Sequence, residues 1–265
     1  MIVSTPTHAI MPSRIAFISF SCVVLASTSV SSAANAQTPA PPTAEQRARD
    51  SVALDGLRND WAGLRRYRDA NAALGAPSPG QNRVVFYGNS ITDGWARYFP
   101  EMFPGRPYVG RGISGQTTPQ MLVRFRQDVV ALQPKAVVIL AGTNDIAGNT
   151  GPSTLEMIED NFMSMTQIAK AHHIRVVLSS VLPVYDYPWK PGLEPAPKII
   201  ALNAWLKRYA NETGEVYLDY HSAMKDARDG LPPNLARDGV HPNDEGYRIM
   251  AVLAESAIAQ ALRGR

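Results

Sequence analysis

Five short, mostly apolar segments recur along this chain, and each is separated from the next by enough residues for a helix. The segments are 84–87 (VVFY), 107–109 (PYV), 136–140 (AVVIL), 175–178 (RVVL) and 216–218 (VYL). Strands covered on both faces of a parallel sheet show continuous apolar sequence, whereas half-exposed strands alternate apolar with polar residues. The segments therefore predict a parallel sheet with helices on both faces.

Helical periodicity between these segments supports the same fold. Apolar residues recur at three- and four-residue spacing within 155–169, 199–209 and 247–258, which predicts three amphipathic helices. Helices that alternate with strands are typical of a three-layer α/β/α sandwich. We expect residues 81–265 to form one such α/β domain, with about five parallel strands in the flavodoxin-like order.

The first 36 residues have the pattern of an export signal. Arg14 gives a positive start, residues 15–30 are apolar or small, and Ala34-Asn35-Ala36 fits a signal-peptidase site. An uncleaved membrane anchor is less favoured, because serines interrupt the apolar segment and it is short for a bilayer span. We predict a signal peptide over residues 1–36, cleaved near Ala36, and hence a bacterial periplasmic or secreted protein.

Composition adds two exclusions. The single cysteine, Cys22, lies inside the predicted signal peptide, so the mature chain would contain no disulfide and no thiolate metal site. The 26 basic and 23 acidic residues are scattered, without a basic stripe that interleaves with aromatic residues, so nucleic acid is not an expected partner. Translation from Met11 instead of Met1 would give a signal of more ordinary length.

Residues 37–80 are expected to join the signal to the domain. Residues 37–43 (QTPAPPT) form a proline-rich linker. A helix should follow, because four apolar residues, Leu54, Leu57, Trp61 and Leu64, recur at helical spacing. We expect this helix to cover part of the core and to end before the glycines and prolines of 75–80.

Four polar motifs fall directly after predicted strands or near the C-terminus. They are 88–92 (GNSIT), 110–112 (GRG), 142–145 (GTND) and 238–241 (DGVH). Residues that follow the carboxyl ends of parallel strands gather along one edge of an open sheet. A serine, a histidine, a carboxylate and several amide donors should therefore meet there, which is the composition of an acyl-transfer site.

Ser90, His241 and Asp238 are the candidate catalytic residues. Ser90 follows the first strand after a glycine, which leaves its hydroxyl exposed at the strand end. Asp238 stands three residues before His241 and can reach its imidazole across one turn, which would fix the tautomer and stabilise the imidazolium. The same sequence could instead be only a turn into the last helix, with Asn243 or Asp244 as the cap.

The oxyanion produced by such chemistry needs hydrogen-bond donors. The Asn144 side-chain amide and the backbone N–H groups of Ser90 and Gly112 are the candidates. Asp145 is more simply explained as a structural or helix-capping residue. Residues 110–115 also match the dinucleotide pattern G-x-G-x-x-G, but they follow the second strand and lack the expected acidic residue about twenty positions later, so we reject this interpretation.

The other histidines are weaker candidates. His172 and His173 are adjacent, at the end of a helix, so they point in different directions and do not suit metal chelation. His221 follows the fifth strand on the expected edge, but no carboxylate stands before it at the same three-residue offset within a turn signal, as Asp238 stands before His241. It is the one alternative to His241.

Aromatic residues near the same edge are candidates for substrate binding. The insertion 182–197 follows the fourth strand and contains Tyr187 and Trp189, and Trp95 lies just after the serine motif. These three rings could stack on a sugar or line an acyl groove. Packing within the protein is an equally economical interpretation.

Together, the four motifs resemble those of the SGNH, or GDSL-like, hydrolases, and bacterial lipase/acylhydrolase members in particular. The domain is also similar to the small subunits of platelet-activating-factor acetylhydrolase. The resemblance implies a serine ester hydrolase without metal or organic cofactor, with Ser90 as nucleophile, Gly112 and Asn144 completing the oxyanion hole, and Asp238 and His241 completing the triad. One position departs from the family pattern, because Asn89 stands where Gly-Asp-Ser has its aspartate.

We therefore expect an exported esterase that acts on short-chain esters, acetyl esters of carbohydrates among them, with a small-molecule or glycan ester as its partner. Two alternatives keep this fold: an acyltransferase to sugar hydroxyls, and a lysophospholipase- or thioesterase-like acylhydrolase. A third is a non-catalytic module that binds acylated glycan. The motifs do not specify acyl chain length, the alcohol portion of the substrate or the oligomeric state.

Overall fold

The structure, a computed structural model, describes residues 43–263, apart from the side chains of Arg49, Ala53 and Leu57. The predicted signal peptide over residues 1–36, with its cleavage site and Cys22, lies outside the described residues, as does the linker up to residue 42. The predicted division at residues 36 and 80 remains an expectation.

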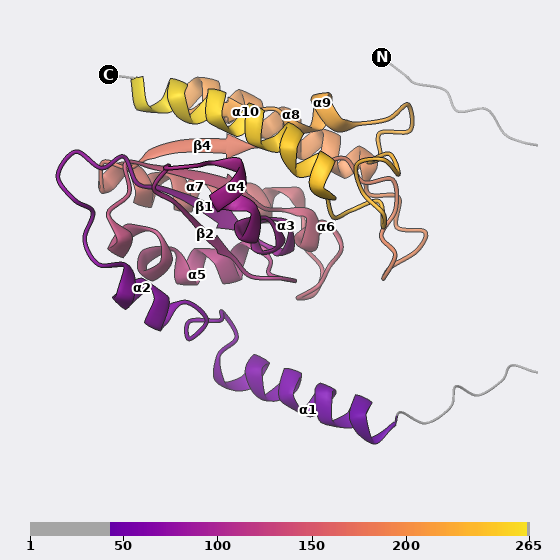
Figure 1. The fold of residues 1–265 in the computed structure, drawn as a ribbon. Coiled ribbons are helices and arrows are strands. Elements are labelled where there is room, and N and C mark those ends of the chain that lie inside the picture. Colours follow the sequence, from indigo (N-terminus) through magenta and orange to yellow (C-terminus); the bar gives the residue numbers. More distant parts are fainter. Residues whose placement is uncertain (1–42, 264–265) are drawn as a thin grey trace, which may run out of the picture. The chain divides into compact units, whose positions relative to one another are not determined.

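A five-stranded, all-parallel sheet forms the centre of the domain (Figure 1). Its strands are β1 (Val84–Gly88), β2 (Tyr108–Gly112), β3 (Ala136–Leu140), β4 (Arg175–Ser179) and β5 (Val216–Leu218). Their spatial order is β2-β1-β3-β4-β5, which confirms the flavodoxin-like prediction. The second strand continues three residues past the predicted 107–109 and includes the whole GRG motif, because Gly112 pairs in register with Gly88.

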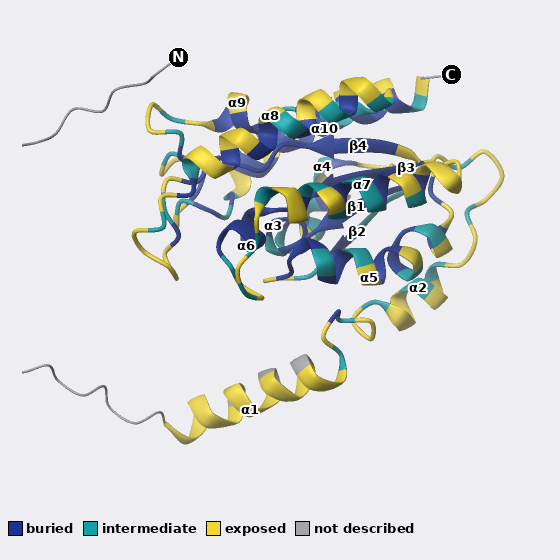
Figure 2. Cartoon of the chain, turned by 180° about the vertical axis from the view of Figure 1, so that it is seen from behind, coloured by how far each residue is buried: buried dark blue, intermediate teal, exposed yellow. Residues whose placement is uncertain are grey.

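Helices cover both faces of the sheet. Successive residues of a strand point to opposite faces, so alternate residues of β1 enter two different cores. Val85 and Tyr87 of β1 belong to a core that includes residues of α5 (Thr118–Asp128), α7 (Leu155–Ala171) and α8 (Ala196–Thr213). Val84 and Phe86 belong to a second core that includes residues of α3 (Ser90–Trp95), α4 (Phe99–Met102), α9 (Tyr220–Met224) and α10 (Asp244–Arg263). The predicted three-layer sandwich is thus confirmed. Figure 2 shows the buried strands between helices whose outer faces are exposed.

Short helical turns complete the domain and place polar residues at the strand ends. The 3₁₀ turns are η1 (Ala96–Tyr98) and η2 (Val130–Leu132), and α6 (Thr143–Ile146) follows β3 almost directly. Ser90 is the first residue of α3 and Asn144 the second of α6. Two of the predicted site residues therefore begin helices at the carboxyl edge of the sheet.

The N-terminal helix differs from its prediction. Helix α1 (Ala44–Asn59) ends before Trp61 and Leu64, and Leu54 is 54% exposed, so the expected apolar face does not cover the core. The side chain of Leu57 lies outside the described residues. The reason is local, because the Asp60 carboxylate accepts from the backbone N–H groups of Leu64 and Arg65, at 2.7 and 3.0 Å, and so stabilises a turn in place of helix.

The segment after this turn supports the domain in other ways. Ala62 is buried and its carbonyl accepts from the Gln116 side chain, while the Trp61 carbonyl accepts from Gln120. Helix α2 (Arg68–Leu74) follows and contacts α5. Within residues 43–263, no helix is long and apolar enough to cross a membrane.

Candidate active site

The turn between β1 and α3 presents the predicted nucleophile. Helix α3 begins at Ser90, and the Asn89 side chain caps it by accepting from the Ile91 N–H at 3.4 Å. A Cβ atom on Gly88 would lie 2.2 Å from Thr92 Oγ1 and 2.6 Å from the Leu140 carbonyl, so only glycine fits there. The tight turn leaves Ser90 partly exposed at the sheet edge.

The loop before α10 brings a base to this serine. Ser90 Oγ and His241 Nε2 lie 2.9 Å apart, although 151 positions separate them in the sequence. His241 Nδ1 lies 2.6 Å from Asp238 Oδ2. Asp238 Oδ1 also accepts from the backbone N–H groups of Val240 and His241, at 3.0 and 2.7 Å. The three predicted catalytic side chains therefore form one continuous hydrogen-bonded chain.

The electrostatics of Asp238 suit the role of an orienting carboxylate. Partial burial works to raise the pKa of Asp238, but the hydrogen bonds from the His241 ring and from the two backbone N–H groups outweigh it, and the pKa lies below its ordinary value. The carboxylate is therefore ionised at neutral pH and accepts the proton-bearing Nδ1 of His241. That tautomer leaves the Nε2 lone pair facing the Ser90 hydroxyl.

Gly112 lies against the serine turn. A Cβ at this position would lie 2.2 Å from the Asp93 backbone nitrogen and 2.7 Å from the Asn89 carbonyl. The end of β2 thus approaches the first turn of α3 more closely than any side chain allows. The Gly112 carbonyl accepts from the Tyr67 hydroxyl, which holds this peptide from its other side.

Asn144 is buried and oriented by two neighbours. Its Nδ2 donates to the Gln116 carbonyl at 2.9 Å, and its Oδ1 accepts from Asn149 Nδ2 at 3.1 Å. An amide nitrogen carries two hydrogens, so the second remains for a ligand. Asp145 has the structural role expected, because its buried carboxylate accepts from the backbone N–H and hydroxyl of Thr118 at the start of α5, and burial raises its pKa.

The three aromatic candidates separate into two groups. Trp95 and Tyr187 are fully buried, so they cannot stack on a substrate in this structure, and this part of the prediction is wrong. Trp95 stacks on Tyr247, with ring centroids 5.7 Å apart. Trp189 is 44% exposed, and its ring centroid lies 6.3 Å from that of His241. Only Trp189 of the three therefore has an exposed surface next to His241.

The insertion 182–197, which carries Tyr187 and Trp189, is tied to α6. The Tyr187 hydroxyl lies 2.9 Å from both the carbonyl and the hydroxyl of Thr143, and burial raises its pKa to about 12. Lys190 Nζ donates to the Ala147 carbonyl at 2.6 Å. The insertion thus braces the short helix that carries Asn144. No local sequence pattern predicts this bracing, or the packing of the exposed Tyr185 ring against the Arg228 guanidinium, because both depend on long-range contacts.

The other histidines of residues 43–263, which are His172, His173 and His221, do not join this chain of hydrogen bonds. The His221 backbone N–H donates to Ser180 Oγ, and its buried Nε2 has no hydrogen-bond partner among the described residues. Burial, with the nearby Lys225 as a second cause, lowers the pKa of His221, so its ring is neutral at neutral pH. His172 is exposed and contacts Arg126. Among the described residues, no hydrogen bond joins His221, the alternative base raised by the sequence, to Ser90.

A cavity of about 420 Å³ adjoins the base. It is lined by Arg97, Tyr98, Arg237, Asp238, His241, Pro242, Asn243 and Asp244. Nearly all of these side chains are polar or charged, so the space beside His241 suits a hydrated, polar part of a substrate better than an alkyl chain.

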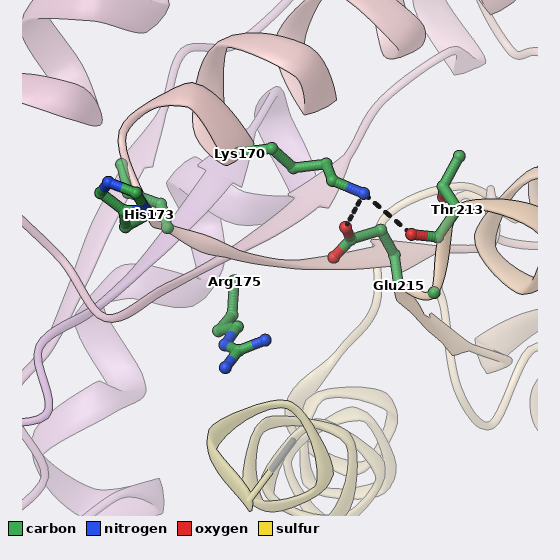
Figure 3. Close-up of a pocket in the computed structure, with 7 residues that line it drawn as sticks. Lys170, His173, Arg175, Thr213 and Glu215 are labelled. Carbon is green, nitrogen blue, oxygen red and sulfur yellow. Dashed lines mark hydrogen bonds and ion pairs between the residues drawn. The ribbon is translucent and has the colours of Figure 1, made fainter. Parts of the chain in front are cut away.

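A second cavity, of about 380 Å³, lies at the opposite edge of the sheet (Figure 3). Arg175, which lines it, is the first residue of β4, whereas Gly88 is the last of β1. Lys170 Nζ lies 3.0 Å from Glu215 Oε1 and donates to the Thr213 carbonyl at 2.8 Å. These contacts connect α7 to the start of β5. Among the residues that line this cavity, no serine or threonine hydroxyl is hydrogen-bonded to a histidine, in contrast to the pair Ser90 and His241.

Comparison with known proteins is consistent with this geometry. The model of the GDSL-like lipase/acylhydrolase family matches residues 86–249, a stretch that includes Ser90, Gly112, Asn144, Asp238 and His241. The match therefore spans both ends of the candidate site and well over half of the chain.

Solved structures and curated relatives extend the comparison. A provisionally assigned acylhydrolase from Bacteroides fragilis is 47% identical, and the alignment covers 77% of this chain and 100% of that one with a TM-score of 0.75. A GDSL-like lipase from Bacteroides thetaiotaomicron is 46% identical over 76% of this chain and 100% of its own, with a TM-score of 0.74. An acetylxylan esterase from Geobacillus stearothermophilus is 26% identical over 64% of this chain and 90% of its own length.

Proposed function

This chain belongs to the GDSL-like lipase/acylhydrolase family and is a carboxylic-ester hydrolase, and we propose that it is an exported serine esterase that removes short acyl groups, acetyl groups on carbohydrates first among them. The single observation that carries the proposed mechanism is the hydrogen-bonded chain from Ser90 through His241 to Asp238. A serine hydroxyl becomes an effective nucleophile when a histidine, oriented by a carboxylate, accepts its proton.

In the first half of the reaction, Ser90 Oγ attacks the ester carbonyl carbon and its proton passes to His241 Nε2. The carbonyl π electrons move onto oxygen, where the backbone N–H groups of Ser90 and Gly112 and the amide of Asn144 donate to the developing charge. The intermediate then collapses, the carbon–oxygen bond to the alcohol breaks, and His241 returns its proton to the leaving alkoxide. The acyl group remains on Ser90 as an ester.

In the second half, water replaces the alcohol. His241 accepts a proton from the water, the resulting hydroxide attacks the acyl carbon, and the Ser90–acyl bond breaks with return of the proton to Oγ. Asp238 stays ionised throughout and stabilises the imidazolium in both halves, in keeping with its lowered pKa.

Solvent access favours hydrolysis over acyl transfer to a sugar hydroxyl. The His241 side chain is 37% exposed and that of Asp238 is 42% exposed, so water reaches the base directly. An acyltransferase must keep water from the acyl-enzyme, and these exposures provide no such barrier.

The lining of the cavity beside His241 supports a short acyl group and a polar alcohol. Each methylene of a long acyl chain contributes about 0.8 kcal/mol only if it leaves water for apolar surroundings. Arg97, Arg237 and Asp244, which line this cavity, provide polar surroundings. Trp189 stands next to this space as a surface on which a sugar ring can pack. The likeness to an acetylxylan esterase supports the same substrate class.

Export is proposed from the sequence of residues 11–36, which combines a basic start, an apolar segment and the Ala34-Asn35-Ala36 site. Fractionation of the cells that produce the protein tests it. Activity in the periplasm or medium, with a mature N-terminus at Gln37, is expected. Protein with an intact N-terminus that remains inside the cell would contradict export but would not bear on the proposed mechanism.

The function is tested with a series of p-nitrophenyl esters from acetate to palmitate, run beside acetylated xylan and a lysophospholipid. The highest kcat/KM is expected for acetate, with release of acetate from xylan and little hydrolysis of the long-chain substrates. Ser90→Ala and His241→Ala should each lower hydrolysis by about 10⁴-fold or more. A preference for palmitate or lysophospholipid would contradict the proposed substrate class, and near-normal turnover of either variant would contradict the mechanism.

A further inference from the structure

Arg124 of α5 carries a positive charge in the interior of the domain. Its side chain has no exposed surface, and the guanidinium lies over the Tyr87 ring, 4.3 Å from the centroid. Burying a charge is costly unless hydrogen bonds and an opposite charge compensate it. Asp128, also fully buried, supplies that charge, with its Oδ2 at 3.1 Å from Arg124 Nη1.

The remaining donors of Arg124 reach the carboxyl ends of the two strands beside the site. Nη2 donates to the Gly88 carbonyl at 2.9 Å, and Nη1 donates to the Arg111 carbonyl at 3.0 Å. Gly88 is two residues before Ser90. The Arg111 carbonyl belongs to the same peptide unit as the Gly112 N–H. Because that unit is planar and trans, holding its oxygen also fixes the direction in which the Gly112 N–H points.

The third proposed donor is connected through Gln116. Arg124 Nε donates to Gln116 Oε1 at 2.5 Å, and the backbone carbonyl of Gln116 accepts from Asn144 Nδ2 at 2.9 Å. One planar guanidinium thus donates to the carbonyl before the serine turn and to the carbonyl of the peptide that carries the Gly112 N–H. It also donates to the side chain of Gln116, whose backbone carbonyl accepts from Asn144. Five donors in a rigid fork make such a three-way attachment possible for arginine, and a lysine ammonium cannot reproduce it.

We propose that Arg124 is a positioning residue that holds the three oxyanion donors, Ser90, Gly112 and Asn144, in their mutual geometry. The inference rests on the proposed roles of those donors. Through the Arg111 carbonyl, Arg124 also polarises the Gly112 peptide, because a hydrogen bond to the oxygen of an amide strengthens the donation of its N–H. Arg124 does not touch the reacting atoms, so its effect is expected in the transition state more than in substrate binding.

The test compares Arg124→Lys with Arg83→Lys. Arg83 is a matched control, since it is also buried and donates to two backbone carbonyls, those of Gly75 and Leu132, but it precedes β1 at the opposite edge of the sheet. Arg124→Lys keeps a cation for Asp128 and should lower kcat for p-nitrophenyl acetate by about 10²-fold, the loss typical of one oxyanion donor. KM should stay near the wild-type value, and Arg83→Lys should keep wild-type kcat.

A trifluoromethyl ketone supplies a readout that a structural role alone would not move. It adds to Ser90 as an anionic hemiketal, so its inhibition constant should weaken in parallel with kcat/KM in Arg124→Lys and stay unchanged in Arg83→Lys. Wild-type kcat and unchanged inhibition in Arg124→Lys would overturn the inference. So would equal losses in both lysine variants, since these would report general destabilisation.

A second variant covers the case in which Arg124→Lys does not fold. Gln116→Met leaves the Arg124–Asp128 pair in place and removes the hydrogen bond from Arg124 Nε to the Gln116 side chain, together with the bond from that side chain to the Ala62 carbonyl. It should lower kcat with little change in KM, and wild-type kcat would contradict the inference. The Ser90→Ala control separates the two levels of failure: if it stays active, the proposed function fails, and if it is inactive while Arg124→Lys has normal kcat, only the positioning role fails.

Discussion

The Asp238 carboxylate holds His241 at two points, through the ring Nδ1 at 2.6 Å and through the backbone N–H at 2.7 Å. One side chain therefore sets both the loop conformation and the orientation of the imidazole. The left-handed backbone of Gly239, with φ of 72°, allows the chain to turn back within the two residues that separate Asp238 from His241.

Replacing Asp238 by asparagine should separate these two functions. The amide oxygen can still accept from the backbone, but an amide facing Nδ1 favours the wrong tautomer and no longer stabilises the imidazolium. We expect kcat for p-nitrophenyl acetate to fall by about 10³–10⁴-fold, with a smaller change in KM. A loss below tenfold in a folded variant would show that Asp238 does not orient the base.

Asp238 should also make stability depend on pH. Its pKa is lowered in the folded state, so the folded protein favours the ionised form more than the unfolded chain does. The resulting stabilisation is present above the ordinary aspartate pKa and is lost as pH falls through the folded-state value. The difference in Tm between wild type and Asp238→Asn should therefore shrink between neutral pH and about pH 2.5. A difference that grows on acidification would contradict this sign.

Asn89 departs from the aspartate usual in this family, and Asn89→Asp tests what the departure changes. The new carboxylate can accept the same hydrogen bond from Ile91, so helix α3 should keep its cap. We expect kcat/KM for p-nitrophenyl acetate to stay within about tenfold of wild type, because the serine turn keeps its geometry. A loss of more than about 10²-fold in a folded variant would show that residue 89 does more than cap the helix.

Trp189 should distinguish glycan esters from small esters. Trp189→Ala removes the exposed ring next to His241 and is expected to raise KM for acetylated xylan about tenfold, while KM for p-nitrophenyl acetate changes little. Trp61→Ala serves as the control, because Trp61 has similar exposure and its hydrogen bond with Gln120 uses the backbone carbonyl, which alanine retains. Equal effects on both substrates would argue against a sugar-binding role.

The fold and the catalytic candidates were predictable because both depend on local sequence. Strands buried on two faces leave continuous apolar segments such as 136–140, and parallel strand ends gather in one place whatever the intervening sequence. The 2.9 Å contact between Ser90 and His241 follows from that topology. The family pattern of four motifs added the assignment of the oxyanion donors.

What the sequence did not show depends on tertiary contacts. Trp95 and Trp189 are both aromatic residues near the site, yet the first is buried against Tyr247 and the second is open, and no periodicity distinguishes them. The N-terminal apolar pattern continued past the point where Asp60 ends α1. Arg124 resembles any polar residue of α5 in the sequence, because its acceptors Gly88 and Arg111 come from other elements.

The most direct measurement is the site and rate of labelling by a fluorophosphonate probe, read by mass spectrometry of the digested protein. A serine activated by His241 should carry the adduct at Ser90 in the wild type, and His241→Ala should slow labelling by about 10³-fold or more. An adduct on another residue, or equal labelling rates in wild type and His241→Ala, would contradict the pairing of Ser90 with His241.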